Sequence, residues 1–271
     1  MKTLIVDCGA TKTLWCTVED GSAQIYRTHG FNLAHTPADV IEGIVAQAAE
    51  KTGSGVDIIY FYGAALVGKS PVDLTKWFPG ATVEYASDML GAARATLGRE
   101  KGIAAIIGTG ANTCLYDGEK ATWKVDCGGF ILGDEGSAAV LGKLFVADFI
   151  KNRVPEPLAN EFREQFGADY PALVKNVYSG TAPARYLGTF APFITGHYHD
   201  SGYARELVDG NFRSFFQKTL LQYPSGLPVG VVGGFGYAAR DILTRMGREY
   251  GISFKTFIEN PMEGLVSYHA I

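Results

Sequence analysis

The chain has 271 residues and a formal net charge of −4, with 47% hydrophobic and 12% aromatic residues. This composition supports a real core in two domains of modest size or in one large one. No basic block and no long apolar stretch occur, so neither a nucleic-acid groove nor a membrane is an expected partner.

In the first part of the chain, apolar β-rich runs alternate with segments of helical periodicity. We expect strands at 2–9, 11–20, 23–30, 56–66 and 81–87. We expect helices at 37–52, 70–78 and 88–98. A proline starts the first helix, and Gly98 ends the last one.

Near residue 102 the same order begins again. Two strands joined by a Gly/Thr turn are expected in 102–118 and a third strand at 120–129. Helices are expected from 137 to about 153 and then irregularly to 223. The last expected elements are a strand at 228–236, a helix at 237–251, a strand at 252–259 and a helix from 262. The repeat predicts an α/β fold of two similar domains, 1–101 and 102–261, with a helical insertion at about 137–223.

Three glycine-rich turns follow apolar strands, namely DCGATKT at 7–13, GTGANT at 108–113 and GGFG at 233–236. Glycine lets backbone N–H groups approach an anion, and threonine hydroxyls add donors. Two such turns facing each other could grip a phosphate. Asp7 would repel a phosphate unless a cation lay between them, and Mg²⁺ suits carboxylate and phosphate oxygens. The alternative is that each turn is only a tight hairpin.

The third turn has a second interpretation. Gly234, Gly236 and Ala239 fit the G-x-G-x-x-A pattern of nicotinamide dinucleotide sites, and Glu259 ends the next strand. Only a short helix follows, however, so an adenosine beside a helix N-terminus fits the same residues.

Several polar residues are candidates for chemistry. Asp88 follows a strand at a helix start, where the helix dipole favours its ionised form, so it is the candidate general base. A plain N-cap is the alternative. Asn32 and Asp134 are candidate polar contacts to a bound ligand, or a turn residue and a helix-start residue respectively. The GHYHD stretch at 196–200 invites a zinc interpretation, but a solvated loop suits it better.

Four cysteines, Cys8, Cys16, Cys114 and Cys127, follow no ligand spacing. They are typical of reduced thiols in a cytosolic protein. The first apolar run ends at Asp7 and is too short for a signal peptide, so a cytoplasmic location is expected.

Four motifs together resemble the actin, hexokinase and Hsp70 ATP-binding superfamily, and more narrowly the N-acetylglucosamine kinase group and its allied BadF/BadG/BcrA/BcrD ATPases. The motif D-G-G-x-T-K-T is matched by Asp7–Thr13, with Cys8 in place of a glycine. The second phosphate motif is matched by Gly108–Asn112, and the adenosine motif by Val231–Gly234. The most specific run is GGFILGDEGS at 128–137, where Phe130 stands in place of a frequent tryptophan.

The resemblance implies two ribonuclease-H-like (actin-like ATPase) domains with a ligand cleft between them, and a last helix, 262–271, that packs back on the first domain. It implies ATP and Mg²⁺ as cofactors, Asp7 at the metal and Asp88 as the catalytic base. The implied nucleotide contacts are Gly9, Thr11, Lys12, Thr13, Gly108, Thr109, Gly110, Asn112, Gly233 and Gly234. The implied sugar contacts are Asn32, Asp88, Thr109, Gly129, Phe130 and Asp134.

The favoured function is an ATP-dependent kinase for an N-acetylated amino sugar such as N-acetylglucosamine, with a homodimer as one expected assembly. One alternative is an activator ATPase of a 2-hydroxyacyl-CoA dehydratase, which needs cysteines for an iron–sulfur cluster. Cys127 lies just before Gly128 and Gly129, but no second cysteine loop follows. A catalytically silent sugar-binding regulator is the other alternative.

Overall fold

The computed structural model describes residues 1–9, 12–33, 36–53, 55–64 and 72–269. The chain divides into two compact units by its internal contacts. The first unit contains Met1–Glu100, Tyr116–Ala121 and Asn260–Ile271, and the second contains Lys101–Leu115 and Thr122–Glu259. Among the described residues, no helix has the length and apolar character needed to cross a membrane.

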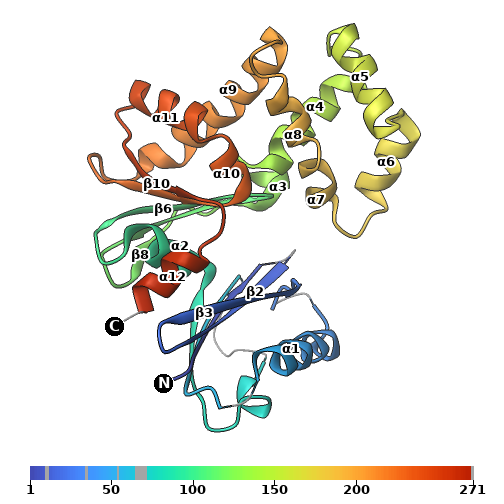
Figure 1. Ribbon diagram of the computed structural model, residues 1–271. Coiled ribbons are helices and arrows are strands. Elements are labelled where there is room, and N and C mark those ends of the chain that lie inside the picture. The colour runs from blue at the N-terminus through green and yellow to red at the C-terminus, as the bar shows by residue number, and fades with distance from the viewer. Residues whose placement is uncertain (10–11, 34–35, 54, 65–71, 270–271) are drawn as a thin grey trace. The chain divides into compact units, whose positions relative to one another are not determined.

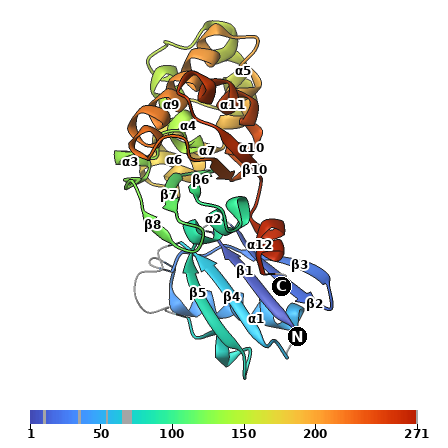
Figure 2. The same ribbon diagram turned by 90° about the vertical axis from the view of Figure 1, so that its left-hand side faces the viewer.

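The first unit is built on a five-stranded mixed sheet with the order β3-β2-β1-β4-β5, of which Figure 1 labels β2 and β3 and Figure 2 labels all five strands. Its strands are β1 (Thr3–Cys8), β2 (Lys12–Glu19), β3 (Ser22–His29), β4 (Ile58–Gly63) and β5 (Thr82–Ser87). The first three strands pair antiparallel, whereas β4 and β5 extend the sheet in parallel with β1. These strands match the expected ones, although β4 is shorter than the run 56–66 that predicted it.

Side chains of β1 alternate between the two faces of this sheet. Leu4 and Val6 join a buried cluster with α1 (Ala38–Thr52). Ile5 faces the opposite side, where it joins a cluster with Met262 and Leu265 of α12 (Met262–His269). The helix α12 also packs on α2 (Asp88–Leu97), and Figure 2 shows the two helices next to each other.

The second unit repeats the first sheet. Its order is β10-β9-β6-β7-β8, so β6 to β10 take the same places as β1 to β5. The strands are β6 (Gly102–Ile107), β7 (Ala111–Tyr116), β8 (Ala121–Trp123), β9 (Val229–Val232) and β10 (Phe254–Ile258). The predicted α/β fold of two ribonuclease-H-like domains is therefore confirmed.

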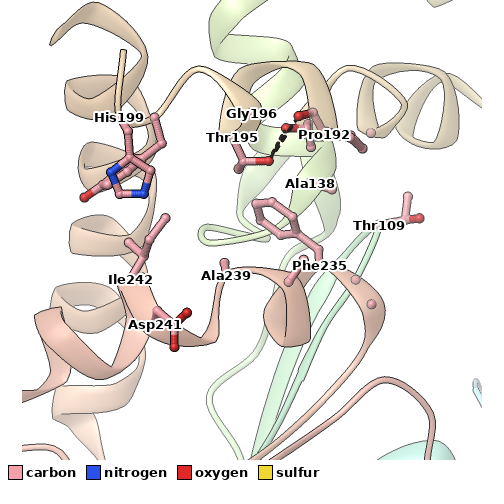
Figure 3. A pocket seen from close by; sticks show the side chains of 16 residues that line it. Thr109, Ala138, Pro192, Thr195, Gly196, His199, Phe235, Ala239, Asp241 and Ile242 are labelled. Carbon is pink, nitrogen blue, oxygen red and sulfur yellow. Dashed lines mark hydrogen bonds between the residues drawn. The ribbon is translucent and has the colours of Figure 1, made fainter. Parts of the chain in front are cut away.

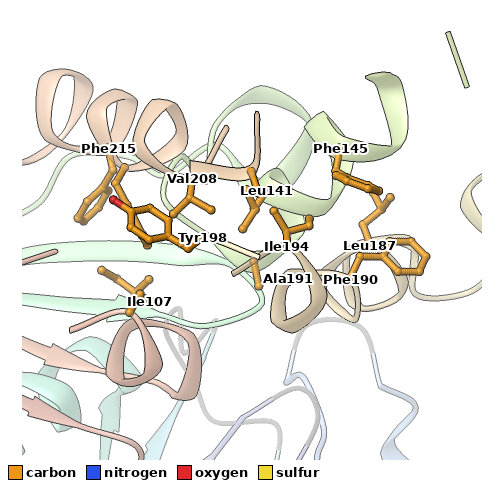
Figure 4. Close-up of a cluster of buried hydrophobic side chains, with 14 of the residues drawn as sticks. Ile107, Leu141, Phe145, Leu187, Phe190, Ala191, Ile194, Tyr198, Val208 and Phe215 are labelled. Carbon is orange, nitrogen blue, oxygen red and sulfur yellow. The ribbon is translucent and has the colours of Figure 1, made fainter. Parts of the chain in front are cut away.

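The helices of the second unit cluster on one large apolar core. They are α3 (Gly129–Leu132), α4 (Ala138–Phe149), α5 (Glu156–Phe166), α6 (Tyr170–Tyr178), α7 (Pro183–Gly188), α8 (Ala191–Gly196), α9 (Gly202–Lys218), α10 (Gly234–Ala238) and α11 (Arg240–Glu249), with the 3₁₀ turn η2 (Leu220–Gln222). Figure 4 shows part of this core, from Ile107 of β6 through Leu141 and Val208 to Phe190. Burial of these side chains ties the inserted helices to the sheet.

Three elements differ from expectation. The described part of segment 70–78 holds only the 3₁₀ turn η1 (Leu74–Lys76), because the Asp73 carboxylate accepts from the N–H and hydroxyl of Thr75 and so competes with a helix. The strand at 120–129 is only three residues long, and the short helix α3 follows it unforeseen. The helix at 237–251 starts earlier, at Gly234, and breaks at Ala239.

Candidate active site

Two carboxylates lie at the same edge of the first sheet. Asp7 of β1 pairs with Tyr62 of β4, and Gly63 of β4 pairs with Ser87 at the end of β5. Asp88 follows Ser87 directly as the first residue of α2. Because parallel strands end at one edge, the fold brings Asp7 and Asp88 near each other.

The electrostatics of Asp7 show how close these groups are. The pKa of Asp7 is raised from 3.8 to about 7, mainly by burial and also by the negative charge of Asp88, while the charge of Lys12 opposes the rise. A carboxyl with this pKa is held in a site that disfavours its own negative charge. A cation placed beside Asp7 and Asp88 would relieve that repulsion.

At the end of β5, the N-cap of α2 and the candidate base are two different residues. Ser87 is the N-cap of α2, since its Oγ accepts from the N–H of Leu90 at 3.2 Å. Asp88 lies one position later, and its Oδ1 accepts from the N–H of Met89 at 2.8 Å. The interpretation of Asp88 as a plain N-cap is therefore wrong, and its carboxylate lies where the positive end of the helix dipole stabilises it.

The first glycine turn joins β1 to β2. The N–H of Gly9 donates to the carbonyl of Lys12 at 3.1 Å, and a Cβ at Gly9 would lie 3.2 Å from that oxygen. Thr13 is completely buried and its hydroxyl donates to the Cys8 sulfur at 3.6 Å, so it faces the interior. Thr11 lies outside the described residues. Of the candidates in this turn, Lys12 is the one whose charge acts on Asp7.

The second glycine turn is fixed to the start of α4. The carbonyls of Gly108 and Thr109 accept from the N–H groups of Ala138 and Ala139 at 3.0 and 3.1 Å. The Ser137 Oγ caps a third N–H group of this helix, that of Val140, at 3.2 Å. The helix N-terminus is thus satisfied by protein groups, so α4 holds the turn in place and an anion would have to meet the turn itself.

Asp134 packs directly on this second turn. A Cβ added to Gly110 would lie 2.9 Å from Asp134 Oδ2, so a side chain at position 110 would displace the Asp134 carboxylate. Asp134 itself has a positive φ of 55°. Burial raises the pKa of Asp134, and a hydrogen bond from the backbone of Ala111 opposes that rise. The structure therefore brings together two candidates, Gly110 and Asp134, that are 24 residues apart in the sequence.

The third turn meets the second one in a pocket of about 610 Å³ within the second unit (Figure 3). Gly108, Thr109 and Gly234 line it. Gly233 has a φ of 123°, and a Cβ there would collide with the carbonyl of Ile107, which explains the glycine. The volume lies in the range of small-ligand sites.

Other residues of this pocket were not foreseen from the sequence. His199, Ile242 and Asp241 lie on one side of it, and Phe235 and Thr195 lie nearer its middle (Figure 3). His199 belongs to the GHYHD stretch interpreted as a solvated loop. That loop enters the pocket because α8 and α9 pack on the core, which no local pattern reveals. Asp241 had a usable signal, since it follows the third glycine turn at the start of a helix.

The remaining candidates lie on separate parts of the two units. Asn32 is in the loop after β3, where its N–H donates to the Thr36 hydroxyl at 2.9 Å. Asn112 accepts from the N–H of Thr113 through Oδ1 at 2.9 Å. Gly129, with a φ of 70°, begins α3, and the half-buried Phe130 packs against the core of the second unit.

The described residues contain no group of three or more His, Cys, Asp or Glu side chains that could hold a metal ion. His197, one of the two histidines behind the zinc interpretation, contacts the Phe193 carbonyl at 2.9 Å and Glu161 at 3.1 Å instead. A Mg²⁺ site needs fewer protein ligands than such a group provides, because Mg²⁺ commonly keeps several waters and binds only one or two carboxylates.

Solved structures resemble this chain over its whole length. A protein of Porphyromonas gingivalis, proposed to be an N-acetylglucosamine kinase, is 34% identical with a TM-score of 0.89, and 98% of each chain is covered. A Chromobacterium violaceum protein with the same proposed activity is 20% identical with a TM-score of 0.70, again over 98% of each chain. A glucokinase of the ROK family from Streptomyces griseus, solved with glucose and AMPPNP, is 17% identical with a TM-score of 0.56, over 100% of this chain and 98% of that one.

At these identities, the last two comparisons bear on the fold alone. No family model and no curated protein matches the chain.

Proposed function

Because the chain belongs to the N-acetylglucosamine kinase-like family of the actin-like sugar kinase fold, we propose that it transfers the γ-phosphate of ATP to a hydroxyl of an N-acetylated amino sugar. N-acetylglucosamine is the proposed substrate. The observation that carries the proposal is the proximity of the Asp7 and Asp88 carboxylates at one edge of the sheet, where β1, β4 and β5 end. Phosphoryl transfer needs a positioned base and neutralised charge, and this edge offers groups for both.

Asp88 is the proposed general base. It would accept the proton of the attacking sugar hydroxyl while its position in the first turn of α2 stabilises the carboxylate before the transfer. The hydrogen bond from the Met89 N–H fixes one oxygen of Asp88, which limits the orientations of the carboxylate. A fixed carboxylate loses less entropy when the sugar binds.

Asp7 fits a magnesium ion by its chemistry. Its carboxyl is buried, lies near a second carboxylate and has a pKa raised to about 7, so the nearby charge of Lys12 does not balance its negative charge. Asp7, directly or through water, would hold Mg²⁺, with Asp88 nearby. Bound there, Mg²⁺ would neutralise charge on the phosphates of ATP. Lys12 would add a second positive charge beside Asp7.

The pocket of the second unit is the proposed nucleotide site. Its apolar residues Phe235 and Ile242 suit the faces of a purine, and Asp241 can accept from ribose hydroxyls. The turns at Gly108–Asn112 and Gly233–Gly236 would lead from the nucleoside to the phosphates. Asn32, Gly129, Phe130 and Asp134 remain the proposed sugar contacts.

The activator alternative lacks a supporting observation. Cys8, Cys16 and Cys114 are buried, and burial raises the pKa of Cys8 to about 12, which disfavours the thiolate that an iron–sulfur cluster needs. Only Cys127 is partly exposed. No observation favours the silent regulator.

A sugar panel tests the proposal. Purified protein with MgATP is incubated with N-acetylglucosamine, N-acetylmannosamine, N-acetylgalactosamine, glucosamine and glucose, and both ADP and phosphorylated sugar are measured. We expect transfer to an N-acetylated sugar, with kcat/KM at least tenfold above that for glucose. ADP formation without any phosphorylated sugar, or equal rates for all sugars, would contradict the proposal.

A further inference from the structure

A second cavity, of about 570 Å³, lies in the first unit at the ends of α2 and α12. It is lined by Arg94, Ala95, Gly98, Arg99, Gly264, Ser267 and Tyr268. Its location separates it from the candidate active site. Asp88 begins α2 and the cavity lies at the opposite end of that ten-residue helix, roughly 15 Å away at 1.5 Å per residue.

Two guanidinium groups give this cavity its charge. Arg94 and Arg99 flank the ring of Tyr268, with their Cζ atoms 5.0 and 4.9 Å from its centroid. Neither arginine forms an ion pair with any of the residues described by the structure. Arg94 is half-buried and instead donates to the Tyr62 hydroxyl at 2.8 Å.

Buried or half-buried charges in proteins are usually paired. The Nε of Arg94 is buried without any hydrogen-bond partner, which adds to the cost of keeping this cation inside. The two arginine charges also act on the neighbouring His269, because burial and the charges of Arg94 and Arg99 lower its pKa to about 4. Arg94 and Arg99 therefore place two positive charges beside the Tyr268 ring, without a counter-ion among the described residues.

We propose that this cavity, which we call the α2–α12 cavity, binds a phosphate dianion. A phosphate with nearly two negative charges matches two guanidinium groups better than a single carboxylate does, and arginine binds phosphate through paired N–H groups. The absence of a side chain at Gly264 lets α12 approach the backbone of α2 at Ala95, and the cavity of about 570 Å³ opens beside this contact. The cavity also has space for an organic group attached to the phosphate, so the ligand is inorganic phosphate or a small phosphomonoester.

The test measures binding to the intact protein by calorimetry, with inorganic phosphate, glucose 6-phosphate and glucose as three probes. We expect saturable binding of a phosphate-bearing probe and none of glucose. Equal affinities for the two anions identify phosphate alone as the recognised group, whereas tighter binding of glucose 6-phosphate shows that the sugar body contributes.

Arg99→Gln is the test variant, because Arg99 is exposed and the change removes one positive charge from the cavity at the loss of its contact with the Tyr268 ring. Arg27→Gln is the matched control, since it removes the same charge from an exposed site on β3 of the same unit. We expect at least a tenfold loss of affinity in Arg99→Gln and none in Arg27→Gln. Equal losses, or no loss in either variant, would show that the anion binds elsewhere and overturn the proposal.

Two further measurements test whether phosphate binds at Arg94 and whether the end of the chain competes with it. In ¹⁵N spectra, the side-chain Nε–H signal of Arg94 should shift with phosphate and stay unchanged with glucose, while Arg94→Lys should weaken binding although it keeps the charge. A chain shortened by residues 270–271 should bind phosphate as the full chain does. If only the shortened chain binds, the chain's own end occupies the cavity and the proposal fails.

Discussion

Ser87 and Asp88 are neighbours whose roles can be separated by mutation. We expect Asp88→Asn to lower kcat by about 10²–10⁴, the usual contribution of a general base, with little change in the sugar KM. The amide keeps the acceptor for the Met89 N–H, so α2 should stay intact. Steady-state kinetics at saturating ATP and N-acetylglucosamine measure the effect.

Ser87→Ala is the matched control for that variant. It removes the cap of α2 and should lower the free energy of unfolding by about 1 kcal/mol while kcat stays near normal. Near-normal turnover in Asp88→Asn would remove Asp88 from the role of base.

The raised pKa of Asp7 predicts an unusual dependence of the free energy of unfolding on pH. Its folded-state pKa of about 7 lies above the ordinary 3.8, so between these values the folded protein holds a proton that the unfolded chain has lost. The resulting penalty on the free energy of unfolding is absent near pH 4, grows up to pH 7 and is complete above it. Asp7→Asn should therefore stabilise the ligand-free protein at pH 8 by on the order of 2–4 kcal/mol, and much less at pH 4.5.

Urea unfolding at the two pH values measures this difference, with Asp20→Asn as an exposed control in the same unit. A gain in Asp7→Asn that is the same at both pH values would show that the burial of charge is not its cause. The stabilised variant should also be inactive, because the strained carboxyl is the proposed metal ligand.

The candidate residues differ in how far local sequence could identify them. Asp7 lies near the end of β1 and Asp88 follows β5, and parallel strands bring their ends together, so pattern and topology suffice to place them near each other. His199 lies in a loop with no periodicity and reaches its pocket only through the packing of the inserted helices. Thr13 differs from both, since a hydroxyl in a phosphate-like motif is completely buried against Cys8, and its contact with the nucleotide stays a prediction.

At the scale of elements, α9 positions the GDEGS run. Asn211 in the middle of α9 is 2% exposed, accepts from the Gly136 N–H at 3.0 Å and donates to the Ser137 carbonyl at 3.1 Å. Asn211→Ala would leave the Gly136 N–H without this acceptor, while the Ser137 carbonyl keeps its bond from the Leu141 N–H, so we expect a loss of about 2 kcal/mol in the free energy of unfolding. Because the same run carries Asp134, the sugar KM should rise as well.

Asn160→Ala is the control for this element, because Asn160 is exposed on α5 and bonds only to the nearby Arg163. Its effect on stability should stay within about 0.5 kcal/mol. A similar loss in both variants would mean that α9 does not hold the run in place.

Element types were easier to predict than element limits. All five strands of the first sheet follow from alternating or continuous apolar runs, and Gly98, with a φ of 62°, ends α2 as expected. The 3₁₀ turn η1 was mistaken for a helix because a side-chain bond from Asp73 decided the local backbone. Helix α3 was missed because its four residues lie between glycines and carry two exposed apolar side chains, Ile131 and Leu132.

At the scale of the whole molecule, the duplication divides the proposed reaction between two units. The candidate base and metal ligand belong to the first unit, whereas the proposed nucleotide pocket belongs to the second. Transfer of a phosphate requires base, sugar and ATP in one line, so the proposed function requires both units to contact the same pair of substrates. A ligand pair that contacts both units favours whichever arrangement allows both sets of contacts.

We therefore expect sugar and a non-hydrolysable ATP analogue together to reduce the radius of gyration measured by small-angle scattering. Such closure would also exclude water, which competes with the sugar hydroxyl for the phosphate. Each ligand alone should give a smaller change, because it satisfies fewer of the contacts, and Asp88→Asn should still close because its sugar affinity is retained. A radius that stays constant with both ligands bound would contradict a kinase that closes around its substrates.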